Sequence, residues 1–283
     1  MNLPSKANLF ILSNITHIDC PAKGLSIYIH CAPSGTAVPR RNMKIAVQLY
    51  SLRDIIKGSG EELLAILPKI KALGYDGVEF AGYFGVDAAT LRAALDSAGL
   101  VAVGTHIAIE SYSPENFDET AAFCRTLGMK TMGMGGADHE TPEELKATCA
   151  ELKAADERAA KIGMSVYYHN HCSEFEPISD GVIPFDELKK AAHLEIDTYW
   201  SFVAGQDNYK LITENRDRIA QLHVKDGIGH TPKALGEGNC DIPEVVRAAK
   251  DIGIEWLIVE NDDPVPNGLD DIGRSIKYLK SII

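Results

Sequence analysis

The stretch Ala72-Leu73-Gly74-Tyr75-Asp76-Gly77-Val78-Glu79-Phe80 joins the end of an amphipathic segment to a short apolar run. Gly74 can adopt the left-handed conformation that ends a helix, and the apolar residue after it returns the chain to a strand. The same junction recurs at four more places: Ser97-Ala98-Gly99-Leu100, Thr126-Leu127-Gly128-Met129, Lys161-Ile162-Gly163-Met164 and Asp251-Ile252-Gly253-Ile254. One helix-to-strand junction used five times predicts alternating helices and strands around a parallel sheet.

From Met43 onward, short apolar runs predict eight strands: Lys44–Leu49, Gly77–Phe80, Val101–His106, Thr131–Met134, Ser165–His169, Leu194–Asp197, Ala220–Val224 and Leu257–Glu260. Longer amphipathic runs predict helices over Glu61–Leu73, Ala88–Ala98, Pro114–Leu127, Pro142–Ile162, Phe185–Ala192, Tyr209–Asn215, Ile242–Ile252 and Leu269–Ser281. Eight strand and helix units in about 240 residues predict a single α/β domain, a (β/α)8 TIM barrel. A doubly wound sheet is the second choice, because no Gly-x-Gly-x-x-Gly follows the first strand.

The amino-acid composition limits the classes of function that this protein can have. The 283 residues are 45% hydrophobic and 24% charged, with a net charge of −12. The acidic balance disfavours a nucleic-acid binder, which needs a broad basic face, and favours a small-molecule partner. No stretch approaches the length of a membrane span, and six scattered cysteines without a Cys-x-x-Cys pattern predict a reduced, cytoplasmic compartment. Homo-oligomerisation stays open.

The first 42 residues differ in composition from the rest of the chain. They carry four basic residues against one acid, and polar residues interrupt the apolar run Leu9–Leu12 before it reaches the length of a signal-peptide core. We therefore expect a poorly packed N-terminal extension over residues 1–42 and the barrel over residues 43–283.

Polar residues gather where the predicted strands end, which in a TIM barrel is the face that holds the active site. Asp197, His223 and Glu260 end strands six, seven and eight, which are neighbours, so their side chains can converge on one ion. On strand five, His169 and His171 share one parity and can both face the barrel while the residue between them faces the helices, so this strand can supply a fourth ligand. Imidazole and carboxylate ligands suit Mn²⁺, Zn²⁺, Co²⁺ or Fe²⁺, and we keep Mg²⁺ as a further candidate. The alternative is that Asp197 caps the next turn and His223 bonds backbone.

Other strand-end residues are candidates for contact with a small-molecule substrate. Trp200 and Tyr50 can lie against the apolar face of a substrate ring, although Trp200 can equally be a buried loop anchor. Lys225 can donate to a substrate oxygen or stabilise an enolate. Glu79 can bond substrate hydroxyls or brace a metal ligand, and we assign His106 to substrate binding as well.

In order and spacing, several motifs together resemble the xylose isomerase-like barrel superfamily, often labelled sugar phosphate isomerase/epimerase: Val47-Gln48-Leu49-Tyr50-Ser51-Leu52-Arg53-Asp54, Gly74–Phe80, Tyr168-His169-Asn170-His171, Leu222-His223-Val224-Lys225-Asp226, Leu235-Gly236-Glu237-Gly238 and Ile258-Val259-Glu260. The resemblance covers residues 43–283. Ketose epimerases of this superfamily bind one divalent metal through Glu, Asp, His and Glu from strands five to eight, and their glutamates move protons next to a carbonyl. The resemblance therefore implies a metal held by His169, Asp197, His223 and Glu260, with His169 in place of the usual glutamate.

The resemblance implies a divalent-metal-dependent isomerase or epimerase of a sugar or keto-sugar, with Glu260, His171 and Lys225 in catalytic roles. Replacing a carboxylate by His169 weakens direct transfer of the two-glutamate mechanism. The alternative is a lyase or dehydratase on a keto-sugar or keto-inositol, similar to inosose dehydratases or 3-keto-glycoside lyases. A non-catalytic sugar-binding barrel is a third possibility. Abasic-site endonucleases share the barrel, but Trp200 stands where they have a second metal-binding histidine, which disfavours DNA repair.

Overall fold

The computed structural model describes residues 10–12, 15–20, 25–30 and 43–283, and the chain divides into two compact units, Met1–Pro39 and Arg40–Ile283. The first unit contains a three-stranded antiparallel sheet of β1 (Phe10–Leu12), β2 (Ile15–Cys20) and β3 (Leu25–His30). Much of the predicted extension lies outside the described residues. Its boundary at Met43 and its poor packing therefore stay predictions.

The second unit is a barrel, which confirms the predicted fold class. Seven parallel pairings join its strands in the order β6-β5-β4-β13-β10-β9-β8-β7. A parallel bridge between His106 and Gly133 links β6 to β7, so the ring is nearly closed. The strands are β4 (Lys44–Gln48), β5 (Gly77–Phe80), β6 (Val101–Thr105), β7 (Thr131–Met134), β8 (Ser165–His169), β9 (His193–Asp197), β10 (Ile219–Val224) and β13 (Trp256–Val259).

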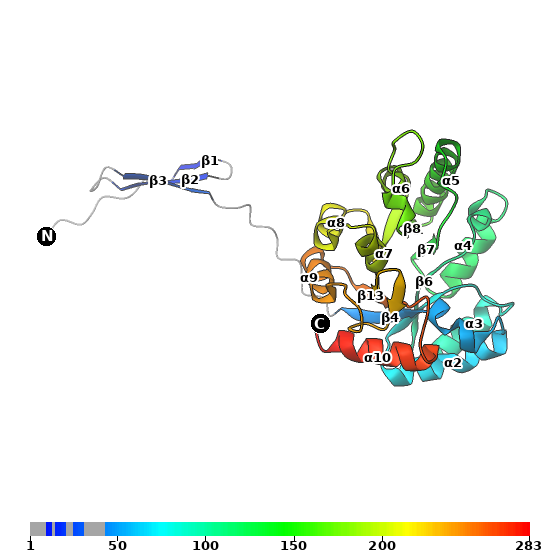
Figure 1. Ribbon diagram of the computed structural model, residues 1–283. Coiled ribbons are helices and arrows are strands. Elements are labelled where there is room, and N and C mark those ends of the chain that lie inside the picture. Colours follow the sequence, from blue (N-terminus) through cyan, green and yellow to red (C-terminus); the bar gives the residue numbers. More distant parts are fainter. Residues whose placement is uncertain (1–9, 13–14, 21–24, 31–42) are drawn as a thin grey trace. The chain divides into compact units, whose positions relative to one another are not determined.

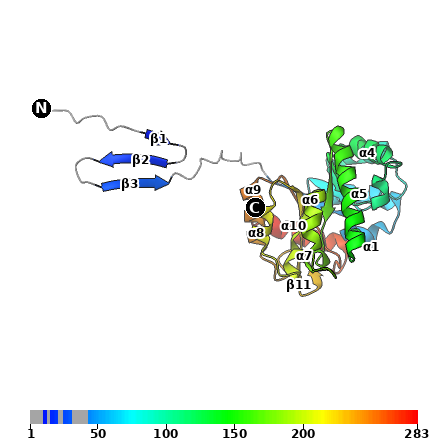
Figure 2. The same cartoon turned by 90° about the horizontal axis from the view of Figure 1, so that it is seen from above.

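Helices cover the outside of the barrel, as Figures 1 and 2 show. The eight main helices are α2 (Gly60–Leu73), α3 (Ala88–Ala98), α4 (Phe117–Thr126), α5 (Pro142–Lys161), α6 (Pro184–Ala191), α8 (Asn208–Glu214), α9 (Ile242–Ile252) and α10 (Gly268–Lys280). All five glycines of the repeated junction have positive φ, between 70° and 98°. The helix-to-strand junction therefore works as predicted, because only glycine adopts this conformation without strain. Among the described residues, no helix has the length and hydropathy needed to cross a membrane.

The structure differs from the predicted elements at several loops. Helix α4 begins at Phe117 rather than Pro114, because Ser113 ends a 3-10 turn over Ile109–Tyr112 and accepts the turn bond of Asn116 instead of capping a helix. A 3-10 turn over Leu49–Leu52 and the short helix α1 (Arg53–Ile56) follow β4, and the short helix α7 (Thr198–Val203) follows β9 directly. A hairpin of β11 (Asp226–Ile228) and β12 (Thr231–Lys233) follows β10. These segments are too short to show a helical or strand period in the sequence.

The barrel interior has an apolar layer and a polar layer. Ala46, Val103 and Ile258 form the apolar layer, whereas most buried apolar side chains lie between the strands and the helices. Tyr167 crosses the interior, where a Cβ on Gly104 or Gly133 would overlap with its ring or hydroxyl group. Above the apolar layer, toward the carboxyl ends of the strands, the interior is filled by buried polar side chains, and these form the candidate site.

Candidate metal and catalytic site

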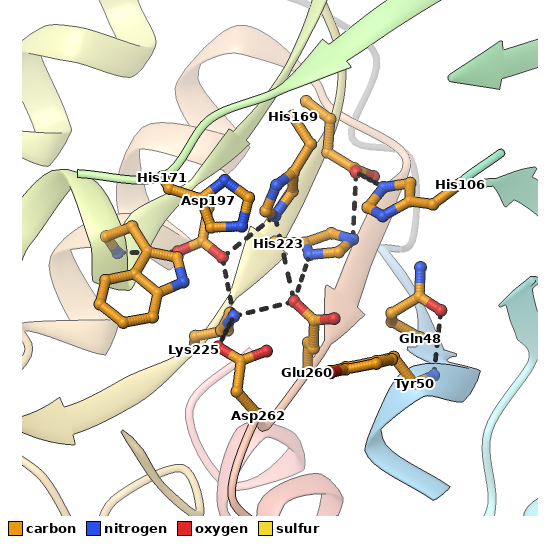
Figure 3. A network of polar contacts seen from close by, with 12 residues as sticks. Gln48, Tyr50, His106, His169, His171, Asp197, His223, Lys225, Glu260 and Asp262 are labelled. Atoms are coloured by element: carbon orange, nitrogen blue, oxygen red, sulfur yellow. Dashed lines mark hydrogen bonds and ion pairs between the residues drawn. The ribbon is translucent and has the colours of Figure 1, made fainter. Parts of the chain in front are cut away.

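The four residues predicted as metal ligands converge in the structure. One possible ligand atom from each of four side chains lies within 4.8 Å of all the others, and all four side chains are buried; they are His169, Asp197, His223 and Glu260. They come from the ends of β8, β9 and β10 and from the residue after β13. Figure 3 shows the four side chains pointing toward one another. Neighbouring parallel strands end at the same edge of the barrel, which is why these distant residues meet.

Asp197 has two roles at once. Its Oδ1 atom accepts hydrogen bonds from the backbone N–H groups of Tyr199 (2.9 Å) and Trp200 (2.8 Å), which caps helix α7. Its Oδ2 atom lies 3.2 Å from both His169 Nε2 and Lys225 Nζ. The capping alternative is therefore correct for one oxygen, and the other oxygen faces the cluster.

The Asn170 side chain bonds to the backbone at the end of the neighbouring strand. Its side-chain amide donates to the backbone carbonyl of Asp197 (3.4 Å) and accepts from the Asp197 backbone N–H (3.1 Å). Strand β8 ends at His169, so the strict alternation of a strand no longer applies to the next residue. Asn170 thus fixes the backbone that carries Asp197.

The two nitrogens of His223 face two different groups of carboxylates. Nδ1 lies 3.0 Å from Glu260 Oε2, inside the four-residue cluster. Nε2 lies 2.6 Å from Glu79 Oε2 and 3.2 Å from Glu195 Oε2, deeper in the barrel. Both sets of contacts involve side chains rather than backbone. Only Nδ1 is directed at a position that an ion bound to Asp197 and Glu260 could occupy.

A second polar layer lies beneath the cluster. Gln221 donates from Nε2 to both Glu79 Oε1 (2.7 Å) and Glu195 Oε1 (2.6 Å). His106 Nε2 lies 2.5 Å from Glu195 Oε2, and its ring stacks on His223 at a centroid distance of 5.3 Å. Glu79 is fully buried and also accepts from Gln48, so bracing fits its contacts better than a bond to substrate.

The buried charges of these two layers shift each other's pKa values. Burial and the Glu195 carboxylate raise the pKa of Glu79. Burial alone raises the pKa of Glu195, but His223 and His106 outweigh it and hold that pKa well below its ordinary value. Burial and His223 lower the pKa of His169 to about 4. His169 is therefore a neutral imidazole at neutral pH, which is the form that binds metals.

Lys225 places a positive charge beside the predicted ligands. Its ammonium lies 2.9 Å from Glu260 Oε2 and 2.6 Å from Asp262 Oδ2, and only 1% of its side chain is exposed. Burial lowers the pKa of Lys225, but Asp197, Glu260 and Asp262 outweigh that effect and raise it. The cluster oxygens thus already contact a cation in this structure.

The remaining predicted site residues lie around the rim. The His171 side chain is 44% exposed, and its ring lies 6.2 Å from that of Trp200. The Trp200 ring centroid is 5.5 Å from Lys225 Nζ, and its buried indole N–H has no hydrogen-bond partner among the described residues. Tyr50 is 45% exposed, at the carboxyl end of β4. These side chains could contact a ligand that enters from solvent.

Sequence reasoning gave no role to several residues of the site. Glu195 and Gln221 lie two residues before Asp197 and His223 on the same strands, so period-two alternation already placed them on the interior face. The sequence therefore contained a signal for the position of both residues. The contact of Asp262 with Lys225 depends on the loop after β13, and no pattern in the sequence indicates it.

The donor set fits a divalent metal. Two imidazoles and two carboxylates converge in a buried site, and this is the ligand chemistry of Mn²⁺, Zn²⁺, Co²⁺ and Fe²⁺. The position of the Lys225 ammonium shows that a positive charge is stabilised beside two of the four predicted ligands. The ligands of a bound metal would also have to lose the protons that they carry, as metal ligands do.

The parallel eight-stranded barrel defines the class of this protein as a TIM barrel, with a buried cluster of histidine and carboxylate side chains at the carboxyl ends of its strands. Its family follows from the sequence. The chain belongs to the xylose isomerase-like TIM barrel family, whose sequence model matches residues 67–282. Barrels of this family commonly bind a divalent metal.

One curated relative is an inosose dehydratase of Geobacillus kaustophilus (strain HTA426), 27% identical over 203 residues, or 62% of this chain. The matched segment spans 66% of that relative, slightly less than two thirds of its length.

Among the solved structures that share the fold are the following two. A sugar phosphate isomerase/epimerase from Parabacteroides distasonis ATCC 8503 is 24% identical with a TM-score of 0.71, covering 84% of this chain and 98% of the other. A D-allulose 3-epimerase from Methylomonas sp., solved with D-allulose, is 18% identical with a TM-score of 0.65, covering 87% and 99%. The family and these neighbours are mostly enzymes.

Proposed function

We propose that this protein is a divalent-metal-dependent isomerase or epimerase that removes a proton next to the carbonyl of a sugar or keto-sugar. The convergence of His169, Asp197, His223 and Glu260 at the carboxyl ends of four neighbouring strands carries the proposal. The family and the epimerase neighbours support the same reaction class.

Each residue of the site has a role in this reaction, and Glu260 has two, as a metal ligand and as the base. A metal held by the four ligands would polarise the substrate carbonyl and the adjacent hydroxyl. Glu260 is the carboxylate that moves the proton, and the buried ammonium of Lys225 stabilises the negative charge that develops on the substrate oxygen. Trp200 and Tyr50 orient the sugar from the rim, and His171 assists proton transfer from its exposed position.

Elimination is the second candidate. A two-base epimerisation uses one carboxylate on each side of the substrate, and His169 stands where one of them would be. Once the proton next to the carbonyl has left, the same enolate can expel a hydroxyl group as water, or an alkoxide as an alcohol. The inosose dehydratase relative favours this outcome.

The experiment is product analysis by NMR in D₂O with the metal-loaded protein and a panel of keto-sugars and keto-inositols. Solvent deuterium at one carbon without loss of water supports isomerisation or epimerisation. An enone or a released alcohol supports elimination instead.

Elemental analysis of the same samples tests the metal site. About one divalent ion per chain is expected, and Asp197→Ala or His223→Ala should release it. If no metal binds even after reconstitution, and no substrate exchanges a proton, a non-catalytic sugar-binding barrel replaces both candidates.

A further inference from the structure

A small cavity lies beside the polar cluster, and we infer that it binds an apolar, ring-sized group on the substrate, such as the aryl group of a glycoside. The cavity has a volume of about 210 Å³. Its lining includes Leu49, Tyr50, Arg53, Ile56, Ala81 and Phe84. This inference rests on the proposed function and chiefly on its elimination candidate, in which a glycoside that carries a ketone would release its aryl group as an alcohol.

The backbone of Phe84 is strained, although its side chain is partly exposed to solvent. Phe84 has a φ of 49°, a left-handed conformation that a bulky residue rarely adopts, and 40% of the residue is exposed. Its ring lies over Gly58 and Gly82, whose missing Cβ atoms would be 4.0 Å and 3.9 Å from it. Backbone strain of this kind concentrates at ligand-binding sites. The strain is unexplained by packing alone, because the ring remains partly in solvent.

The cavity opens on the same face of the barrel as the cluster. Its lining follows the carboxyl ends of β4 and β5, and β4 pairs with β13, the strand that leads to Glu260. Arg53 joins the two regions, since its guanidinium donates to the backbone carbonyl of Asp262, whose carboxylate contacts Lys225. A substrate held at Lys225 and Glu260 could therefore extend toward Tyr50 (Figure 3).

The chemistry of the lining selects the occupant. The Arg53 guanidinium lies 4.3 Å from the centroid of the Tyr50 ring, and its Nη1 and Nη2 atoms each donate to a backbone carbonyl, so both terminal nitrogens have a partner within the protein. What remains exposed to the cavity is mainly aromatic and aliphatic carbon. An apolar cavity of about 150 Å³ holds benzene, so this one has room for a single ring, and it is smaller than the roughly 300 Å³ at which whole-ligand pockets begin.

The test compares phenyl β-D-glucopyranoside with methyl β-D-glucopyranoside by calorimetric titration of the metal-loaded protein. The two probes differ only in the group that the cavity would hold. We expect the phenyl glucoside to bind about tenfold more tightly, the effect of burying one apolar ring.

Two variants test whether the cavity itself, rather than the stability of the fold, determines the preference for the phenyl glucoside. Phe84→Gly removes the ring and relieves the left-handed strain, so its melting temperature should stay within a few degrees while the preference for phenyl disappears. Ala81→Leu fills the cavity without removing an aromatic ring and should also abolish the preference. Phe202→Ala, which removes an exposed aromatic residue that does not line the cavity, should keep it.

Equal binding of the two glucosides to the wild-type protein overturns the inference, and so does an unchanged preference in Phe84→Gly and Ala81→Leu. Tighter binding of glucose 6-phosphate than of the phenyl glucoside also overturns it, since Arg53 would then serve an anion. Metal content and deuterium exchange, measured on the same samples, report on the proposed function separately. A protein that holds metal and exchanges protons but shows no preference for phenyl retains the function and loses only the aryl site.

Discussion

The Nζ atom of Lys225 lies 2.9 Å from the Oε2 atom of Glu260, the same oxygen that lies 3.0 Å from His223 Nδ1. An ammonium and a predicted metal ligand therefore share one carboxylate oxygen in a site with almost no solvent exposure. The ammonium partly neutralises the carboxylates of Asp197 and Glu260 when no metal is bound.

Lys225→Met should therefore lower the free energy of unfolding more in the metal-free protein than in the metal-loaded protein. Removing one partner of a buried ion pair costs about 3–5 kcal/mol, because the other charge stays buried without compensation. Urea unfolding with and without a chelator measures the effect, and added metal should recover most of the loss. Lys189→Met, which breaks an exposed pair with Asp186, should change the free energy of unfolding by less than about 1 kcal/mol. Equal stability of Lys225→Met and wild type in chelator would contradict the assignment of this charge.

The histidine that ends β8 and the histidine two residues later should behave differently. His169 is 2% exposed and faces Asp197, so His169→Ala should weaken metal binding by at least about tenfold, as measured by competition with a chelator. His171→Ala should keep the metal and lower turnover, because its side chain lies at the exposed rim.

His169→Glu distinguishes a ligand from a packing residue. A carboxylate there restores the ligand set of the epimerases and should still bind metal. Native activity should fall, because one more negative charge disfavours a developing enolate. Full metal occupancy in His169→Ala together with loss of metal in His171→Ala would reverse the two assignments.

Glu195 should act on the metal through His223. Its carboxylate lies 3.2 Å from His223 Nε2, on the side of the ring away from Glu260. Glu195→Gln leaves the volume unchanged but weakens the contact that orients the ring, so metal affinity should fall about 10- to 100-fold. Glu214→Gln, on the exposed face of α8, is the matched control. An unchanged affinity in Glu195→Gln would show that the second layer only fills the barrel.

The lowered pKa of Glu174 predicts that the folded protein loses stability in acid. Burial alone raises its pKa, but the contacts with His171 and the charge of His139 outweigh burial and hold the pKa at about 2. A carboxyl whose folded pKa lies below its unfolded value of about 4.5 stabilises the protein above that pH, and the contribution disappears as the pH falls toward 2. The depression of the pKa from 4.5 to about 2 corresponds to roughly 3 kcal/mol. Chemical unfolding between pH 6 and pH 2 should therefore show a steeper loss for wild type than for Glu174→Gln, and parallel curves would contradict the assignment.

Much of the architecture could be predicted from the sequence because each helix end depends on a few neighbouring residues. Each of the five junction glycines needs only its own left-handed φ to end a helix, so the order of strands and helices follows from neighbouring residues. Once eight such units predict a barrel, the residues at the strand ends must share one face, which is why Asp197, His223 and Glu260 could be grouped before any coordinates.

The tertiary structure decided which side chains touch inside that face. Glu79 and Glu195 are 116 positions apart, and their proximity depends on the closure of the barrel and on the Gln221 amide that bridges them. Similarly, the contact of Lys225 with Asp262 and the bond of Asn170 to the Asp197 backbone arise where strands give way to loops, and alternation stops there. Local conformation follows from local sequence, whereas the partners of a buried charge are set by the strands that closure brings beside it.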